Sequence, residues 1–321
     1  MKPELRLYRH LPRYDSQRES AVTIGNFDGV HRGHQAILAR LRQAADVRGL
    51  ASTVITFTPH PRAYFAQRGH RPELIPTQIN SLRDKIDALT THGVEQVVLK
   101  RFNQSMADMS AEDFILSLLV RGLNTRWILV GEDFRFGRQR RGNLDLLAHA
   151  GRDHGFHVDV IADVADTQGH RISSSEVRNA LAGGHVERAN FLLGRPYQIS
   201  GHVIHGKKLG RDIGFPTLNL RVPQHCAARS GIYVVLAHGL APEPMRAVAS
   251  IGVRPTVAQD GELLLEVHLL DASVDAYGKL VRIEFLEHLR DEAAFPGLDA
   301  LVAAIEQDVQ RARLYFATHG R

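Results

Sequence analysis

Residues 23–38 read TIGNFDGVHRGHQAIL, and this stretch decides how the first half of the chain folds. A short apolar strand pattern runs up to Gly25, a glycine-rich turn follows, and a helical pattern begins near Gly33. At such a junction, backbone N–H groups and the positive end of the helix point to the space above a parallel sheet. The stretch therefore predicts an anion site at the head of a Rossmann-like sheet.

Two histidines, His31 and His34, lie on either side of Gly33. From this spacing both imidazoles can flank one anion, and the glycine lets the backbone approach closely. Hydrogen-bond donors on a phosphate favour in-line attack at an α-phosphorus, because negative charge builds on the nonbridging oxygens in the transition state. Two alternatives stay open here: surface histidines, in a chain that holds 18, or metal ligands. A metal is the weaker alternative, because no third ligand is spaced nearby.

Outward from this stretch, residues 21–194 alternate between strand and helix patterns. Strands are predicted for the β-rich runs at residues 21–25, 52–57, 94–100, 126–132 and 156–163. Helical patterns lie between them, and Ser110 with Asp113 forms a capping pair before one helix. Strict alternation favours parallel strands joined by crossover helices. We therefore predict an α/β fold for this half.

After Arg195 the pattern becomes all-β. The predicted strands lie within residues 197–206, 231–239, 246–253, 262–271 and 279–289. A final helical stripe is expected to pack on this barrel or sandwich, through Leu298, Leu301, Val302, Ile305 and Val309. Gly194 ends a helix and Pro196 prevents its continuation, so the boundary falls nearby. We predict one domain over residues 1–186 and another over residues 187–321.

Composition narrows the function classes. A chain of 321 residues fits about two domains. Forty Lys and Arg against 35 Asp and Glu give a net charge of +5, but the excess is spread along the chain and does not indicate nucleic acid. The single cysteine, Cys226, allows neither an intrachain disulfide nor a zinc ribbon. The first 20 residues show no apolar run typical of a signal peptide, and no window reaches the 18 apolar residues of a membrane span, so we expect a soluble, cytoplasmic protein.

Residues 205–220, HGKKLGRDIGFPTLNL, look at first like a P-loop. The segment lacks a closing GK[ST] triplet and lies in an all-β context, which excludes that motif. Its glycines and cations predict a flap that wraps a polyphosphate, and they are Gly206, Lys207, Lys208, Gly210, Arg211 and Gly214. Thr217 and Asn219 project to one face of an extended strand, where their oxygens suit Mg²⁺.

Glu266 is the lone carboxylate in the run LLLEVHLL. Strand alternation places it opposite Leu265 and Val267. The residues alone leave two readings open, an outward solvated glutamate or an inward functional one. On the same face, His268 is the weaker candidate for a base and fits a packing role.

The first-half motifs resemble those of the bacterial bifunctional riboflavin kinase/FMN adenylyltransferase family. The matching stretches are GNFDGVHRGHQ, TFTPHPRAYF at 56–65, LVGEDFRFGRQRRGN at 129–143 and RISSSEVRNAL at 171–181. The resemblance implies a nucleotidylyltransferase domain in which His31 and His34 are catalytic and lie on the phosphates of ATP. The other phosphate-binding residues that it implies are Gly25, Asn26, Phe27, Gly33, Ser174 and Arg178. It makes His60 and Asp133 flavin candidates, although His60 between two prolines also suits loop stiffening. The serines at 173–175 are also compatible with an ordinary capped helix. The run RQRR at 138–141 is also compatible with a solvated loop or a nucleic-acid-binding loop.

The second half resembles the riboflavin kinase signature. The shared elements are PTLN at 216–219, SGIYVV, SIGVRPTV, LEVHLLD and LRDEAAF. The resemblance implies an antiparallel β-barrel with a terminal helix, in which Glu266 is the general base, and it makes Arg254 and Arg290 flavin candidates. The sequence departs from relatives at Ala272 and Ser273, where an aromatic residue is common.

The resemblance implies two reactions. Riboflavin is phosphorylated by ATP to FMN, and FMN then attacks a second ATP to give FAD and pyrophosphate. Mg²⁺ is the implied cofactor, ATP the substrate, and FMN and FAD the product ligands. Partners are expected to be these small molecules, with neither nucleic acid nor membrane, and self-association is left open. The alternatives are a nucleotidylyltransferase for another substrate with a flavin-binding regulatory domain, or a non-enzymatic flavin-responsive or nucleic-acid-binding protein.

Overall fold

The computed structural model describes residues 5–11, 18–206, 210, 213–254, 262–272 and 274–320, without the side chains of residues 253 and 254. The chain divides into two units, each compact in itself. The first contains the chain up to Pro76 together with Lys85–Ser173, and the second contains Thr77–Asp84 together with Ser174–Arg321. Among the described residues, no helix has both the length and the apolar composition needed to cross a bilayer.

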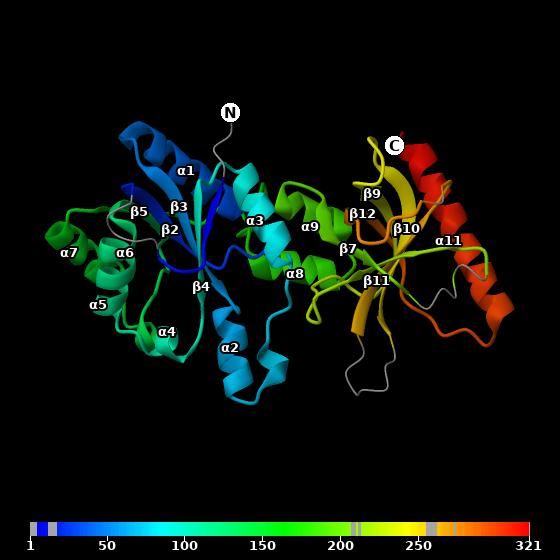
Figure 1. Cartoon of the computed structure of the whole chain (residues 1–321), viewed down its shortest axis with the longest axis horizontal. Coiled ribbons are helices and arrows are strands. Elements are labelled where there is room, and N and C mark those ends of the chain that lie inside the picture. The colour runs from blue at the N-terminus through cyan, green and yellow to red at the C-terminus, as the bar shows by residue number, and fades with distance from the viewer. Residues whose placement is uncertain are drawn as a thin grey trace. The chain divides into compact units, whose positions relative to one another are not determined.

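The first unit is built on a six-stranded parallel sheet in the order β1-β4-β3-β2-β5-β6 (Figure 1). Its strands are β1 (Arg6–Tyr8), β2 (Ser20–Ile24), β3 (Ala51–Thr58), β4 (Gln96–Arg101), β5 (Thr125–Gly131) and β6 (His157–Ile161). The predicted α/β fold is confirmed. The edge strand β1 was not predicted, because three residues are too few to establish an alternating pattern.

Helices cover both faces of this sheet. Helices α1 (Arg32–Arg48) and α3 (Leu82–Thr91) pack on one face through an apolar layer that includes Leu41 and Leu89. The other face carries α4 (Gln104–Asp108), α5 (Ala111–Asp113), η3 (Phe114–Val120), α6 (Arg121–Leu123) and α7 (Leu144–His154). The predicted Ser110 cap is confirmed, because its Oγ accepts a 2.9 Å hydrogen bond from the N–H of Asp113. The smaller elements are α2 (Pro61–Arg68), η2 (Pro72–Leu74) and η4 (Arg138–Arg140).

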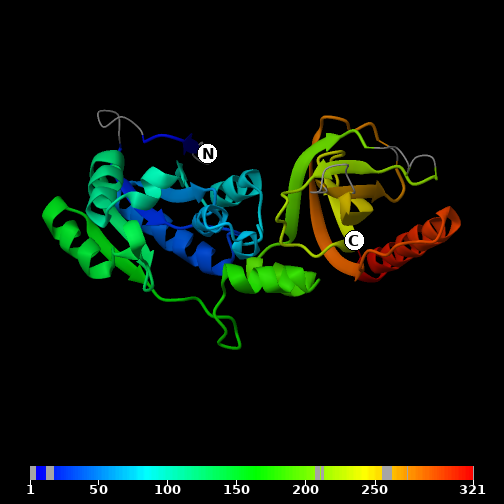
Figure 2. The ribbon, with the colours of Figure 1, turned by 90° about the horizontal axis from the view of Figure 1, so that it is seen from below.

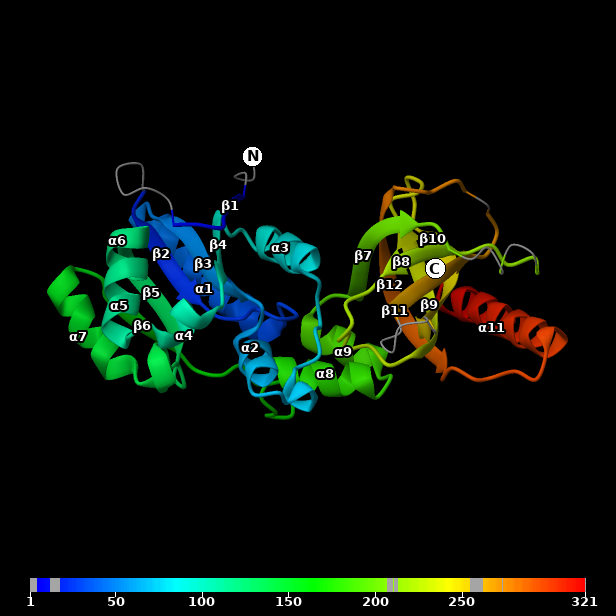
Figure 3. The same cartoon turned by 60° about the horizontal axis from the view of Figure 1, so that its bottom comes forward.

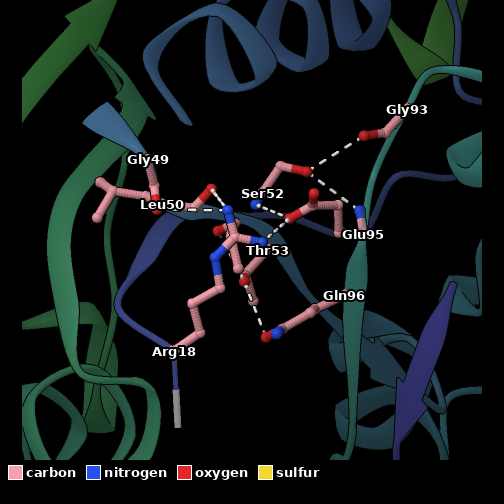
Figure 4. A network of polar contacts seen from close by, with 9 residues as sticks. Arg18, Gly49, Leu50, Ser52, Thr53, Gly93, Glu95 and Gln96 are labelled. Carbon is pink, nitrogen blue, oxygen red and sulfur yellow. Dashed lines mark hydrogen bonds and ion pairs between the residues drawn. The ribbon is translucent and has the colours of Figure 1, made fainter. Parts of the chain in front are cut away.

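A polar network fixes the strands at the amino ends of β3 and β4 (Figure 4). Ser52 Oγ donates to the carbonyl of Gly93 at 3.1 Å, and a carboxylate oxygen of Glu95 accepts from the N–H of Ser52 at 3.1 Å. Thr53 Oγ1 donates to Gln96 Oε1 at 3.3 Å. Because all six strands are parallel, these bonds hold the end of the sheet opposite to the loop that leads into α1.

The second unit centres on a closed antiparallel barrel in the order β10-β11-β8-β7-β12-β9 (Figure 3). Its strands are β7 (Tyr197–Ile204), β8 (Leu218–Arg221), β9 (Gly231–His238), β10 (Met245–Arg254), β11 (Glu262–Leu269) and β12 (Leu280–Arg290). Alternate residues fill the interior, where the ring of Phe285 contacts those of Tyr197 and Tyr233. The predicted antiparallel barrel is confirmed. Helices α8 (Ser174–Ala182) and α9 (Val186–Leu193) precede it, and Gly194 caps α9 with φ 65°.

The terminal helix α11 (Leu298–His319) lies along the outside of the barrel (Figure 2). Its deepest apolar contacts come late in the helix, at Ala312 and Phe316, which pack with Val234 and Val248 of the barrel. Leu298 at the start of the predicted stripe is instead 53% exposed.

Asp308 anchors the same helix. Its carboxylate accepts two hydrogen bonds from the guanidinium of Arg290, at 2.9 and 2.6 Å, and Asp308 is 3% exposed.

Asp308→Ala leaves Arg290 without this partner, so we expect a loss of about 2 kcal/mol in the free energy of unfolding. Hydrogen–deuterium exchange of the amides of β9 and β10 at increasing urea concentration measures this loss of stability. The control is Arg313→Ala, which removes an exposed ion pair with Asp271 and should cost under about 1 kcal/mol. Equal effects would contradict this prediction.

The segment Thr77–Asp84 belongs to the barrel unit although it interrupts the first unit in sequence. The N–H of Ala227 donates to the carbonyl of Gln78 at 2.9 Å. Ser200 Oγ on β7 donates to a carboxylate oxygen of Asp84 at 2.5 Å, and Ser81 Oγ donates to the other oxygen at 2.7 Å. Asp84 is 9% exposed, so these hydroxyls satisfy a buried carboxylate.

Candidate active sites

The loop between β2 and α1 has a constrained backbone. Phe27 and Val30 have φ values of 47° and 43°, a region that side chains with a Cβ seldom adopt. Phe27 is 1% exposed, and its ring lies 3.0 Å from where a Cβ on Gly25 would be. Gly25 therefore leaves room for the buried ring, and its N–H donates to the carbonyl of Ile55 at 3.1 Å.

His31 and His34 stand together at the start of α1. The imidazole of His31 is the N-cap, and its Nδ1 accepts a hydrogen bond from the N–H of His34 at 3.4 Å. The two rings stack with centroids 3.8 Å apart. A Cβ on Gly33 would lie 3.1 Å from His31 Nδ1 and 3.1 Å from the carbonyl oxygen of Ile172, so only glycine fits easily. The N-terminus of a 17-residue helix and two imidazoles thus converge on one place, which suits an anion.

The other sites predicted in the first half have identifiable contacts. His60 caps α2, because its Nδ1 accepts from the N–H of Arg62 at 3.1 Å. Asp133 is 76% exposed at its side chain and accepts from Arg171 at 3.4 Å. Ser174 is the first residue of α8, and Arg178 Nε on that helix donates to the carbonyl of Thr77 at 2.7 Å. Ser174 and Arg178 belong to the second unit, unlike the histidines.

A group of aromatic side chains was missed from the sequence. Phe57 near the end of β3, Tyr64 and Phe65 on α2, and Phe102 after β4 make edge contacts with ring centroids 5.4 to 5.9 Å apart. Phe65 is 53% exposed, which is unusual for a ring in a packed cluster. Phe57, Tyr64 and Phe65 all lie in the motif TFTPHPRAYF, which was the available signal in the sequence. Sequence spacing cannot show that Phe102 joins them.

In the barrel, strand register brings three of the predicted residues, Asn219, Glu266 and Arg290, into one row with two that were not predicted, Ser250 and Ile232. Asn219 on β8 pairs with Glu266 on β11, which pairs with Ser250 on β10. Ser250 pairs with Ile232 on β9, and Ile232 pairs with Arg290 on β12. Leu265 and Val267 beside the glutamate are fully buried in the interior, so Glu266 lies on the opposite face, as alternation predicted.

All five residues of this row line one cavity of about 480 Å³. The cavity lies on the outer face of the barrel, and α11 supplies part of its lining through Leu301, Ile305, Asp308 and Val309. Phe215 and Phe295 add aromatic surface, and Thr217 and Gly210 contribute from the segment before β8. A volume of this size with apolar sides and a few convergent polar groups is typical of a small-molecule site.

Asn219 is 6% exposed and contacts Thr217, since its Nδ2 donates to the carbonyl at 3.3 Å and to Oγ1 at 3.5 Å. A Cβ on Gly206 would lie 2.6 Å from Asn219 Nδ2, so Gly206 makes room for this amide. A ring nitrogen of His268 lies 3.0 Å from the carbonyl oxygen of Pro216, and the ring contacts Phe215. His268 thus supports the segment that carries Thr217.

Several residues named in the sequence analysis cannot be placed, and one lies elsewhere. Lys207, Lys208, Arg211 and Ser273 fall outside the described residues, and the side chain of Arg254 is not described. Gly214 has a φ of 89° and does not line the cavity. Among the described residues, no group of three or more His, Cys, Asp or Glu could hold a metal ion.

A second carboxylate, Glu292, lies in the same cavity and was not predicted. Its Oε1 lies 1.9 Å from where a Cβ on Gly252 would be, so the carboxylate packs against that glycine. Burial raises the pKa of Glu292, and the negative charge of Glu266 adds to this, while a hydrogen bond with Ser250 and the charge of Arg290 oppose it.

The raised pKa predicts a dependence of stability on pH. Ionised Glu292 is disfavoured on folding, so stability is lost as pH rises through the folded pKa. Glu292→Gln should therefore raise the Tm of the barrel unit slightly at pH 7 and leave it unchanged below about pH 4, where the carboxyl is protonated in both states. Thermal unfolding at both values measures this. Glu287→Gln, an exposed change on β12, is the control, and a pH-independent effect of Glu292→Gln would contradict the prediction.

The N-terminus of α1 with its two histidines suits an anion, and the barrel cavity holds a strand carboxylate beside hydroxyl and amide oxygens. These two sites are typical of an enzyme that transfers phosphate groups. The FAD synthetase family model matches residues 14–176, and the riboflavin kinase model matches residues 193–316. The bifunctional riboflavin kinase/FMN adenylyltransferase of Pseudomonas fluorescens is 44% identical, over 92% of this chain and 93% of that protein. The chain belongs to the bifunctional riboflavin kinase/FMN adenylyltransferase family, which confirms the resemblance seen in the motifs.

Two further proteins are similar to this chain over nearly its whole length. The protein of the same description from Escherichia coli (strain K12) is 42% identical, over 94% of both chains. A solved structure described as a macrolide-efflux protein from Streptococcus pneumoniae is 30% identical, with a TM-score of 0.79, and covers 96% of this chain and 98% of that one.

Proposed function

We propose that each half of the chain carries one of the two reactions of the family, residues 1–186 adenylyl transfer and residues 187–321 phosphorylation of riboflavin, at the sites described above. The barrel unit phosphorylates riboflavin with ATP to give FMN. The α/β unit transfers the adenylyl group of a second ATP to FMN, giving FAD and pyrophosphate. The observation that carries this proposal is the cross-strand row, in which Glu266 lies beside Asn219 in a cavity of about 480 Å³.

In the barrel reaction a hydroxyl is the nucleophile, so a base is required. The terminal ribityl oxygen bonds to the γ-phosphorus of ATP, the bond from that phosphorus to ADP breaks, and the hydroxyl proton passes to the carboxylate of Glu266. The apolar side of the cavity, with Phe215, Phe295 and the residues of α11, suits the flavin ring system.

The nucleotide is assigned to a neighbouring cavity of about 340 Å³. It is lined by Pro216, Thr217, Asp275 and Tyr277 among others. Thr217 lines both cavities, so the phosphate to be transferred would lie near this residue. The flap residues Gly206 and Gly210 adjoin the same segment, as a polyphosphate site requires.

Thr217 and Asn219 fit a Mg²⁺ ion. A hydroxyl and an amide are hard oxygen donors, which this ion prefers, and the phosphates of ATP complete such a site. Gly206 packs against the Asn219 amide and so helps to fix this side chain. When bound, the ion would neutralise charge on the phosphate oxygens.

In the α/β reaction the nucleophile is a phosphate oxygen of FMN, which carries no proton at neutral pH, so no base is needed. A bond forms from that oxygen to the α-phosphorus, and the bond to pyrophosphate breaks. The protein has only to place donors on the developing charge, which is what His31, His34 and the N-terminus of α1 offer. The exposed ring of Phe65 and its neighbours suit stacking of the flavin.

The division into catalytic domains at residues 186 and 187 is part of this proposal. A fragment of residues 187–321 keeps every residue that lines the larger cavity, so it should phosphorylate riboflavin and form no FAD. It lacks Asp84, the carboxylate that Ser200 contacts, so its Tm should lie below that of the barrel unit in the intact chain. Separation of FMN from FAD in the product measures this. A folded fragment without kinase activity would refute this division.

The test of the whole proposal is one incubation. The protein is given riboflavin, ATP and Mg²⁺, and FMN and FAD are resolved over time, with FMN alone as substrate in a parallel reaction. We expect FMN first, then FAD. FAD from FMN without phosphorylation of riboflavin would support the alternative of a regulatory barrel.

A further inference from the structure

A half-buried lysine supports the loop that leads into α1. Lys85 lies in the first turn of α3, and its Nζ donates a 2.8 Å hydrogen bond to the carbonyl of Asn26. Thr56 Oγ1 donates to the same carbonyl at 3.1 Å. Burial lowers the pKa of Lys85, and the negative charge of Asp28 opposes this. Asp28 is 7% exposed, so the charges of a buried carboxylate and a half-buried ammonium stabilise each other beside the loop.

The loop needs such support because its backbone is strained. Three of the four residues after Asn26 have left-handed φ values, 47° at Phe27, 88° at Gly29 and 43° at Val30. Each non-glycine residue in this region costs about 1 to 3 kcal/mol and persists only where the surroundings impose it. The peptide that Lys85 holds is the one that enters the strained turn, so its orientation sets where His31 begins the helix.

We propose that Lys85 is a positioning residue for adenylyl transfer, which holds the Asn26 carbonyl so that His31 and His34 meet the reacting phosphate. The inference rests on the proposed function of this loop. It assigns a role to a residue that lies outside every motif discussed above, more than fifty residues along the chain from the histidines. Through Lys85, α3 contributes to the adenylyl-transfer site without contacting the substrate.

The test compares two activities of the same full-length protein. In Lys85→Met, the kcat of FAD formation from FMN should fall about tenfold or more, since small displacements of reacting groups are costly. The KM for ATP should change by less than about threefold, because the phosphate contacts themselves remain. Riboflavin phosphorylation in the same preparation should stay within about twofold of wild type, since its cavity lies in the other unit.

Two further variants sharpen the test. Lys85→Gln keeps a donor that can reach toward the Asn26 carbonyl and should fall between wild type and Lys85→Met. Arg83→Met removes one positive charge from the same turn of α3, at an exposed side chain, and should leave both activities unchanged.

Three results would overturn the inference. They are FAD formation within about twofold of wild type in Lys85→Met, an equal fall of both activities in both Lys85 variants, and a loss confined to the KM for ATP. The last would make Lys85 a binding residue. Failure of the wild-type protein to convert FMN to FAD would refute the proposed function instead, so the two failures are distinguishable.

Discussion

Glu266→Gln is expected to slow riboflavin phosphorylation by about 10²- to 10⁴-fold while leaving the conversion of added FMN to FAD unchanged. Glutamine keeps the size and hydrogen bonding of the side chain but cannot accept the ribityl proton. The row that joins Asn219, Glu266 and Ser250 is held by main-chain pairing, so the substitution should leave the cavity in place. The loss should therefore appear in kcat more than in KM.

The measurement is the initial rate of FMN formation at saturating ATP. Glu262→Gln is the matched control, because it makes the same chemical change on the same strand, at a side chain that pairs with Arg221 at the surface. Retained kinase activity in Glu266→Gln would assign the base to another residue. His268 is the next candidate, although its ring already lies against the carbonyl of Pro216.

The sequence was sufficient for the architecture because the hydrophobic period reports which faces of an element are buried. Alternating strand and helix patterns require parallel pairing, and β2 to β6 pair in this way. Closely spaced strands after Arg195 require an antiparallel fold. A strand of three residues is too short to show a hydrophobic period, which is why β1 was not predicted. It also cannot show that Thr77–Asp84 leaves its neighbours in sequence to join the barrel unit.

The candidate sites also divide into features that local sequence spacing indicates and features that depend on distant parts of the chain. Local spacing indicated that His31 and His34 share one end of a helix, because the residues that decide it are within four positions of each other. Strand alternation indicated the face of Glu266. It could not pair Glu266 with Asn219, since β8 and β11 are separated in sequence by β9 and β10, and it could not set the register that places Ser250 of the neighbouring strand β10 beside Glu266.

Long-range contacts account for the rest. Lys85 and Glu292 have ordinary sequence surroundings, and only their contacts with Asn26 and Gly252 distinguish them. The terminal helix was predicted as a cover for the barrel. Its residues Ile305 and Asp308 also line the cavity, which a helical stripe alone cannot indicate.

The double substitution of His31 and His34 by alanine is expected to abolish nearly all FAD formation, since each donor to a developing negative charge is worth about 10²-fold or more. FMN should accumulate from riboflavin, because the kinase cavity contains neither histidine. His31 also caps α1, so part of the loss would be structural; alanine in place of a capping side chain costs about 1 kcal/mol. A loss of that size lowers the melting temperature by a few degrees but cannot account for a 10⁴-fold fall in rate at 25 °C.

The control is His149→Ala with His154→Ala, two exposed histidines of α7 in the same unit, which should leave both activities unchanged. If the His31 and His34 double variant made FAD from added FMN at the wild-type rate, the adenylyl-transfer site would have to lie elsewhere, and the stacked rings at the head of α1 would serve only to cap the helix.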